Sequence, residues 1–185
     1  MTYFLQSKML KDNFHGFFTR KGGLSSGNFK SLNCDLNSLD QNSLVMANRK
    51  IVAKTIKVNS RNLITLKQVH SSKVVNIREL ITSNIIEGDA MVTSIKDISL
   101  GILTADCAPI FFAENNTGVI GAAHAGWRGA LGSIIENTVE EMIKIGAKKD
   151  LISAVIGPCI QQENYEVGGE FLEIFLDKDV KYRKY

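Results

Sequence analysis

Six short apolar runs follow one another between residues 63 and 125, and they constrain the fold more than any other feature of the sequence. Several are apolar at nearly every position, which predicts strands that are buried on both faces. The polar turns HSS and ENNTG predict that some neighbouring strands form hairpins. The predicted strands cover residues 63–70, 73–77, 89–94, 98–105, 109–114 and 118–125.

A helix is predicted over residues 40–58, upstream of these strands. Asp40 or Asn42 is expected to cap its N-terminus, because either side chain can accept a hydrogen bond from a free backbone N–H. Apolar residues at helical spacing line one side of this helix. Its solvent-exposed face is expected to carry Arg49, Lys50, Lys54 and Lys57.

Downstream of the strands, helical and strand patterns alternate. Residues 130–146 and 167–178 show the apolar spacing of amphipathic helices, and residues 151–159 read as another buried strand. A further strand is expected within the first 20 residues. These patterns predict an α/β (α+β) fold, a single layered domain in which a mixed central β structure is flanked by helices. The chain lacks the glycine motifs of dinucleotide and P-loop sites, so neither site is predicted.

Length and composition exclude several classes of protein. The 185 residues fit one domain spanning 1–185, and a net charge of +3 is far from that of a nucleic-acid-binding protein. No apolar run is long enough to cross a bilayer, and the first residues lack the apolar core of a signal peptide. The three cysteines are unclustered, which favours a reducing cytoplasm over a disulfide scaffold.

Two histidines and one cysteine stand at the ends of three strand-like runs: His70, Cys107 and His124. Three ligands of this kind form an open zinc site, with the fourth position free for water or substrate. The spacings are too wide for a zinc finger, so the fold must bring the three residues together. The alternatives are a surface histidine at a hairpin end for His70 and a small buried apolar residue for Cys107.

Several other residues are candidates for the same site. Asp89 precedes a predicted strand and reads either as a general acid/base or partner of a ligand histidine, or as a turn cap. Arg128 begins the helix after His124 and could bind an anion or pair with a carboxylate. Arg20 and Ser25 belong to a Gly/Ser-rich loop that could also bind an anion or be an ordinary turn.

Four further residues are expected to have structural or surface positions. Trp127 is expected to pack against neighbouring side chains, although it could stack on a planar base. Cys34 and Cys159 are expected to be structural, and His15 is expected to lie on the surface.

The motifs TRKGGLSSGNFKSLN, KQVHS, EGDAMVT, TADCAP, AHAGWRG and IGPCI occur in this order from about residue 16 to the end of the chain. Together they resemble the laccase-domain family of purine nucleoside phosphorylases, also called the polyphenol oxidase or YfiH-like family. The resemblance implies the YfiH-like layered fold and a zinc ion on His70, Cys107 and His124. Compared with that family, the chain is expected to be short at its C-terminus.

The resemblance also implies phosphorolysis of adenosine, inosine, guanosine and methylthioadenosine, together with deamination of adenosine. His70, Cys107, His124 and Asp89 are then the expected catalytic residues, with Asp89 as the acid that protonates the departing base. The expected partners are purine nucleosides and phosphate, with no nucleic acid and no membrane, and a homo-oligomer is allowed. The residues expected to bind substrate or phosphate are Arg20, Ser25, Asn33, Gln68 and Arg128.

Three alternatives from other functional classes stay open at this stage. A thiol hydrolase would use Cys107 as nucleophile and a histidine as base. A polyphenol oxidase would use copper, which binds N/S sites more tightly than zinc, but three histidines are too few for a multicopper centre. A non-catalytic protein would bind its ligand without turnover, and some members of the resembled family have been linked to peptidoglycan editing.

Overall fold

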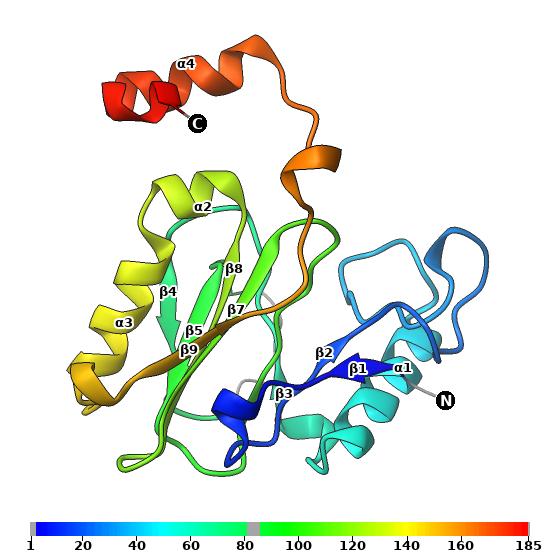
Figure 1. Cartoon of the computed structure of the whole chain (residues 1–185). Coiled ribbons are helices and arrows are strands. Elements are labelled where there is room, and N and C mark those ends of the chain that lie inside the picture. Colours follow the sequence, from blue (N-terminus) through cyan, green and yellow to red (C-terminus); the bar gives the residue numbers. More distant parts are fainter. Residues whose placement is uncertain (1–2, 81–85, 185) are drawn as a thin grey trace.

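The structure is a computed structural model that describes residues 3–80 and 86–184. The strands of its central sheet are β4 (Val74–Asn76), β5 (Ala90–Thr93), β7 (Ala108–Glu114), β8 (Val119–Ala125) and β9 (Ser153–Ile156). Their order across the sheet is β4-β5-β8-β7-β9 (Figure 1). β4 and β5 are parallel, and all other neighbours are antiparallel. The predicted mixed central β structure is therefore confirmed.

Two smaller sheets flank the central one. One is antiparallel and consists of β1 (Phe4–Leu5) and β2 (Phe17–Phe18), which confirms the strand predicted near the N-terminus. The other is parallel and consists of β3 (Leu63–Ile64) and β6 (Ser99–Leu100). The strands predicted over 63–70 and 98–105 are thus much shorter than the apolar pattern suggested.

One of the two predicted hairpins forms and the other does not. β7 and β8 pair along their whole length across the ENNTG turn, where Gly118 adopts a positive φ of 73°. The HSS turn does not join two paired strands, because β3 pairs with β6 and β4 pairs with β5. At that turn His70 has a φ of 58°, so the chain changes direction and leaves the layer of β3.

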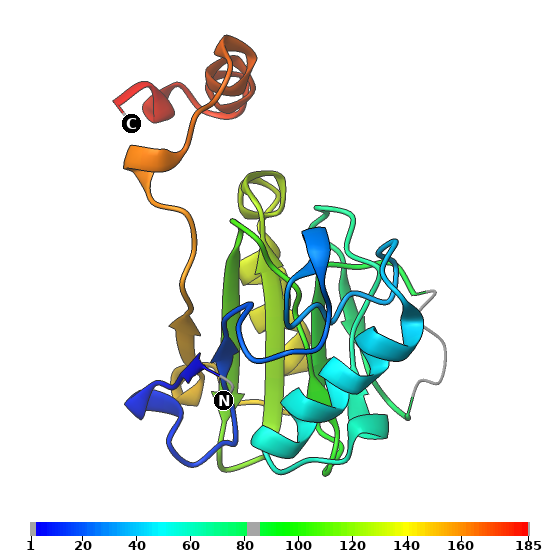
Figure 2. The same cartoon turned by 90° about the vertical axis from the view of Figure 1, so that its right-hand side faces the viewer.

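Helices cover both sides of these sheets. α3 (Ile134–Lys144) packs on one face of the central sheet around Ile134 and Met142, while Met91 on the other face packs under the β3–β6 layer. α1 (Asn42–Thr55) lies outside that layer, with Val52 against Leu63. Figure 2 shows α1 in cyan in front of the sheet and α3 in yellow behind it.

The helix predicted over 130–146 is interrupted. α2 (Trp127–Leu131) ends at Gly132, and Ser133 has a φ of 67°, which breaks the helix before α3 begins. A Cβ atom at position 132 would lie 3.1 Å from Arg128 O, a closer contact than most Cβ atoms make, so glycine fits this turn well. The predicted cap of α1 is also wrong, because Gln41 occupies that position and makes no side-chain cap.

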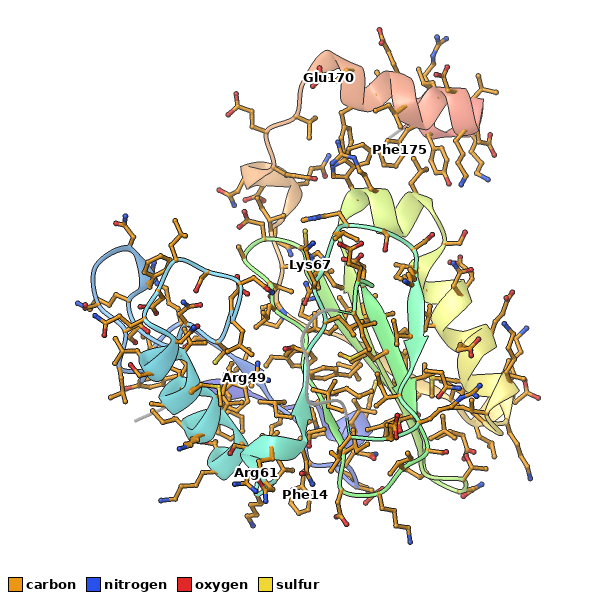
Figure 3. All side chains as sticks on the ribbon, turned by 180° about the vertical axis from the view of Figure 1, so that it is seen from behind. Phe14, Arg49, Arg61, Lys67, Glu170 and Phe175 are labelled. Atoms are coloured by element: carbon orange, nitrogen blue, oxygen red, sulfur yellow. The ribbon has the colours of Figure 1, made fainter. Side chains whose placement is uncertain are left out.

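Arg49 and His15 are buried, which contradicts the predicted exposure of both. The Arg49 guanidinium points inward from α1 (Figure 3) and donates to Leu63 O at 2.7 Å, Thr65 Oγ1 at 3.2 Å and Cys34 O at 3.3 Å. Burial lowers the pKa of Arg49. The ring of His15 accepts from the Ser7 backbone N–H at 2.9 Å and lies 2.8 Å from Asn13 O. Arg49 ties a loop to β3, and His15 joins two loop segments near the N-terminus, which the helical spacing and the local sequence did not reveal.

The last helix, α4 (Gly169–Lys178), confirms the prediction for residues 167–178 and lies next to α2 (Figure 1). Phe171 and Phe175 contact the ring of Trp127, with centroids 5.1 and 6.0 Å away, which confirms a packing role for Trp127. Lys178 also donates to Leu131 O at 2.6 Å. None of the helices in the described residues combines the length and the apolar character that a membrane crossing requires. A single domain over 1–185 stays a prediction.

Replacing Arg49 with alanine is expected to lower the free energy of unfolding by about 3 kcal/mol, because buried acceptors would lose their donors. Urea unfolding would measure the change. Lys50→Ala, at the adjacent exposed position of α1, is the control and should change stability by less than about 0.5 kcal/mol. Equal effects of the two substitutions would contradict the role of Arg49.

Candidate metal centre

The structure brings His70, Cys107 and His124 together, as the sequence predicted. Their potential ligand atoms all lie within 4.8 Å of one another. His124 belongs to β8 and is opposite Pro109 of β7, and Cys107 immediately precedes β7. The chain bends at residues 105–107, and the Cys107 thiol lies close to the ring nitrogens of the two histidines. His124 is buried, Cys107 is half-buried and His70 is exposed, so the group opens to solvent on one side.

Two imidazoles and a thiol form a donor set that fits a metal ion. The rings of His70 and His124 have centroids 4.8 Å apart and cross at 72°, so they approach a common point from different directions. Neutral imidazole and thiolate are the ligands that zinc and soft transition metals prefer. This group could therefore hold a metal through three protein ligands.

The carboxylate of Asp89 lies directly beneath this group. Its Oδ1 is 2.9 Å from the Nδ1 of His124 and accepts from the His70 backbone N–H at 2.9 Å. Its Oδ2 accepts from the backbone of Val69 at 3.2 Å and from both the backbone and the hydroxyl of Ser71 at 2.7 Å. Asp89 therefore contacts the segments that carry two of the three candidate ligands.

Gln68 ties the segment of His70 to the segment of Cys107. Its side-chain amide donates to Leu103 O at 2.7 Å and accepts from Leu103 N at 2.8 Å. Both functional groups of Gln68 are thus used within the protein. Gln68 therefore lies next to the site, where its two hydrogen bonds join two loops.

Gly126 lets the three ligand-bearing segments approach closely. A Cβ atom at this position would lie 2.9 Å from Cδ2 of His70 and 3.2 Å from Sγ of Cys107. The first distance is shorter than real Cβ contacts allow, so any side chain here would displace His70. The motif AHAGWRG contains this glycine, but its steric role is visible only in the folded chain.

The electrostatic environment differs between Asp89 and Cys107. Burial would raise the pKa of Asp89, but hydrogen bonds from His124, Ser71 and Val69 outweigh it and hold the pKa below its ordinary value. Burial, followed by the charges of Asp106 and Asp89, raises the pKa of the Cys107 thiol. Without a bound cation, Cys107 is therefore a poor thiolate nucleophile at neutral pH.

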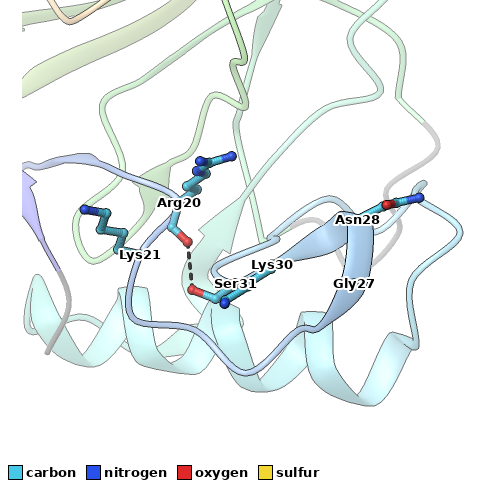
Figure 4. Close-up of a pocket in the computed structure, with 6 residues that line it drawn as sticks. All are labelled: Arg20, Lys21, Gly27, Asn28, Lys30 and Ser31. Atoms are coloured by element: carbon cyan, nitrogen blue, oxygen red, sulfur yellow. Dashed lines mark hydrogen bonds between the residues drawn. The ribbon is translucent and has the colours of Figure 1, made fainter.

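A basic pocket of about 450 Å³ lies on the glycine-rich loop (Figure 4). Arg20, Lys21 and Lys30 contribute three cationic side chains, and none of the residues lining the pocket is acidic. Arg20 and Lys30 also line the larger hollow that His70 and Cys107 line, so the basic pocket and the metal group share one open region. The full lining of the basic pocket is Arg20, Lys21, Gly27, Asn28, Lys30 and Ser31.

Asn48 of α1 holds this loop in shape. It is fully buried, accepts from Leu24 N at 2.8 Å, and donates to Ser25 Oγ at 2.9 Å, Ser31 O at 3.2 Å and Asn33 O at 2.8 Å. Asn48 lies on the buried side of α1 beside Val45 and Val52, but the sequence did not predict its hydrogen bonds to this loop. The feature of the sequence that could have indicated this role was a polar amide among the apolar residues of one side of the helix.

Ser25 and Asn33, both predicted to bind substrate, take part in the same network. Ser25 is buried and donates to Asp40 at 2.6 Å, and Asn33 donates to Asp40 at 3.0 Å and to Ser38 at 2.9 Å. Among the six lining residues of the basic pocket, neither appears. Ser25 and Asn33 therefore make their side-chain hydrogen bonds to other residues of the loop network.

Arg128 of α2 stacks on its neighbour Trp127, and the anion contact predicted for Arg128 stays a prediction. Its guanidinium carbon is 4.2 Å from the centroid of the Trp127 ring, and the side chain is exposed. No ion pair with a carboxylate is present for Arg128 within the described ranges. The stacking holds the guanidinium group at the surface of α2.

Comparisons with known proteins show which family this chain resembles. A family model described as multi-copper polyphenol oxidoreductase laccase matches residues 14–185. A purine nucleoside phosphorylase of Deinococcus radiodurans is 43% identical over 83% of this chain, and the match covers 59% of that relative. Adenosine deaminase RL5, from an unknown prokaryotic organism, is 35% identical over 89% of this chain and 66% of its own length.

Solved structures share the fold. The Bacillus licheniformis protein YfiH superposes with a TM-score of 0.79 at 30% identity, covering 88% of this chain and 63% of YfiH. The predicted YfiH-like layered fold is therefore confirmed. The chain spans about 60% of the length of the relatives cited here.

A Gly126→Ala substitution is expected to weaken zinc binding by about tenfold or more, because the added methyl group would displace His70. Competition with a coloured zinc chelator would measure the affinity. Gly169→Ala is the matched control, since an added Cβ there meets no atom within 4 Å. Unchanged zinc affinity in the Gly126 variant would contradict this role of the glycine.

Proposed function

We propose that this chain, which belongs to the multi-copper polyphenol oxidoreductase laccase family, is a zinc-dependent purine nucleoside phosphorylase that also deaminates adenosine. The observation that carries the proposal is the convergence of two imidazoles and a thiol within 4.8 Å on the rim of an open hollow. Relatives named purine nucleoside phosphorylase and adenosine deaminase support the reaction class.

The metal site consists of His70, Cys107 and His124. Bound zinc supplies a Lewis acid that lowers the pKa of a water molecule and polarises an oxygen of the substrate. The three side chains would hold the metal, and the exposure of His70 leaves the group open to solvent, as a catalytic zinc site requires. Copper could occupy the same ligands, because it binds such sites more tightly than zinc.

Phosphate binding is assigned to the basic pocket. Arg20 provides a planar guanidinium that suits phosphate oxygens, and Lys21 and Lys30 add positive charge at the same pocket. Arg128, which stacks on Trp127, is a second exposed guanidinium and follows Gly126 by two residues. These side chains would bind phosphate and orient it for attack on the ribose.

We do not assign Asp89 the predicted role of the acid that protonates the departing base. Protonation of a departing purine requires an acid that reaches the substrate, but both oxygens of Asp89 already accept hydrogen bonds within the protein. Asp89 is also absent from the residues that line the hollow. We also assign Ser25, Asn33 and Gln68 to holding the loops of the site, because their side chains hydrogen-bond within the protein. Of the three, Asn33 and Gln68 also line the hollow.

The rival functions have weaker support. A multicopper oxidase needs many histidines, and of the three in this chain His15 is buried with both ring nitrogens in contact with the N-terminal backbone. A thiol hydrolase needs a low thiol pKa, whereas that of Cys107 is raised. A non-catalytic role is not favoured by any contact in the site.

The cellular setting is also a proposal. All three cysteines are free, which fits a reducing cytoplasm. Nucleic acids and membranes are not among the proposed partners, and a homo-oligomer stays a prediction.

Incubation of the protein with adenosine and phosphate is expected to yield adenine and ribose 1-phosphate, with inosine from deamination. Chromatography with and without prior removal of metal by a chelator would check this. All products should disappear after chelation and return with zinc, because the metal polarises the reacting groups. Full turnover after complete metal removal, or no turnover with zinc bound, would contradict the proposal.

Arg20→Ala is expected to raise the KM for phosphate by about tenfold, because a charge-assisted hydrogen bond would be lost. The KM for adenosine in deamination should change much less, since water replaces phosphate in that reaction. Steady-state kinetics of both reactions on one preparation would separate the two effects. Lys54→Ala, at an exposed position of α1, is the control, and equal changes in both KM values for Arg20→Ala would count against a phosphate site.

A further inference from the structure

A fully buried carboxylate with five hydrogen-bond donors lies beneath the candidate metal ligands. We propose that this residue, Asp89, is a positioning residue that assembles the site before any metal binds. The inference rests on the proposed function only in taking His70, Cys107 and His124 as the metal ligands. Four of the donors come from the turn at 69–71 and the fifth is the ring of His124.

The first step concerns the backbone at His70. A φ of 58° places this residue in the left-handed region, which is unfavourable for a residue with a side chain. In this conformation the backbone N–H groups of Val69, His70 and Ser71 all donate to the carboxylate of Asp89, at 3.2, 2.9 and 2.7 Å. Successive amides in such a turn form an anion-binding concavity, and here the anion is part of the protein. Asp89 thereby stabilises the turn that directs His70 toward the site.

The second step concerns the ring of His124. Its Nδ1 lies 2.9 Å from Oδ1 of Asp89 and can only donate to that carboxylate oxygen, so the proton stays on Nδ1. Nε2 is then the nitrogen with a free lone pair for a metal. The backbone N–H of His124 also donates to Asp89 O at 2.7 Å, which fixes the distance between the two residues.

The third step concerns charge. The one ion-pair contact that Asp89 makes within residues 3–80 and 86–184 is with His124, so no lysine or arginine there neutralises it. Its negative charge is therefore stabilised by neutral donors of the turn and remains available to stabilise positive charge beside His124. Carboxylate partners of this kind orient ligand histidines and increase their basicity.

The decisive experiment uses zinc as the only ligand and the full chain. In the metal-free wild-type protein, ¹⁵N NMR of the histidine side chains is expected to show His124 as a single tautomer protonated on Nδ1. Asp89→Asn replaces one oxygen by an NH2 group that faces existing donors. It should therefore give mixed tautomers of His124 and weaken zinc binding by about 10- to 100-fold.

Two further variants complete the test. Ser71→Ala removes one of the five donors and should weaken zinc binding by about two- to tenfold while His124 keeps its tautomer. Asp150→Asn, at an exposed acidic residue outside the site, is the control for loss of a carboxylate and should leave both readouts unchanged.

The inference is overturned if the neutral ring of His124 in the metal-free wild-type protein carries its proton on Nε2, a result that needs no variant to fold. It is equally overturned if folded Asp89→Asn keeps the wild-type tautomer and zinc affinity. None of these readouts uses a nucleoside. A protein that passes them but has no phosphorylase or deaminase activity would contradict the proposed function and leave the role of Asp89 intact.

Discussion

The register of β8 between β5 and β7 is the constraint on which the rest of the site depends. Ala90 of β5 is opposite Ala123 of β8, and Pro109 of β7 is opposite His124. This register places Asp89 and Cys107, just outside β5 and β7, on either side of His124. A slip by one residue would turn His124 to the other face of the sheet and separate the three candidate ligands. Small residues along β8 also let α3 pack closely on this strand.

Features determined by local sequence were predictable. The ENNTG hairpin follows from turn chemistry, and α3 and α4 follow from apolar spacing. The convergence of His70, Cys107 and His124 was predictable because chemically distinctive side chains stood at strand ends, although their mutual distance was not. The motif resemblance added the expected fold, which the similarity to solved structures confirms.

Features determined by distant partners were not predictable. Arg49 has the spacing of an exposed helical residue, but Leu63 and Thr65 of another layer accept its hydrogen bonds. The turn after Val69 looked like a hairpin, yet Asp89 redirects it from 20 residues away. Both cases depend on buried polar groups that find their partners only in the folded chain.

The description of the family and the names of the relatives point to different chemistry, and the three side chains that converge in this protein fit a mononuclear metal site. A multicopper centre needs more histidine ligands than this chain contains, whereas one mononuclear site needs only the three residues that converge. X-ray absorption at the zinc edge, on protein purified with its native metal, tests this account most directly. The account predicts one zinc per chain, with one sulfur ligand at about 2.3 Å and two imidazole nitrogens at about 2.0 Å. A metal shell without sulfur, or several copper ions per chain, would contradict it.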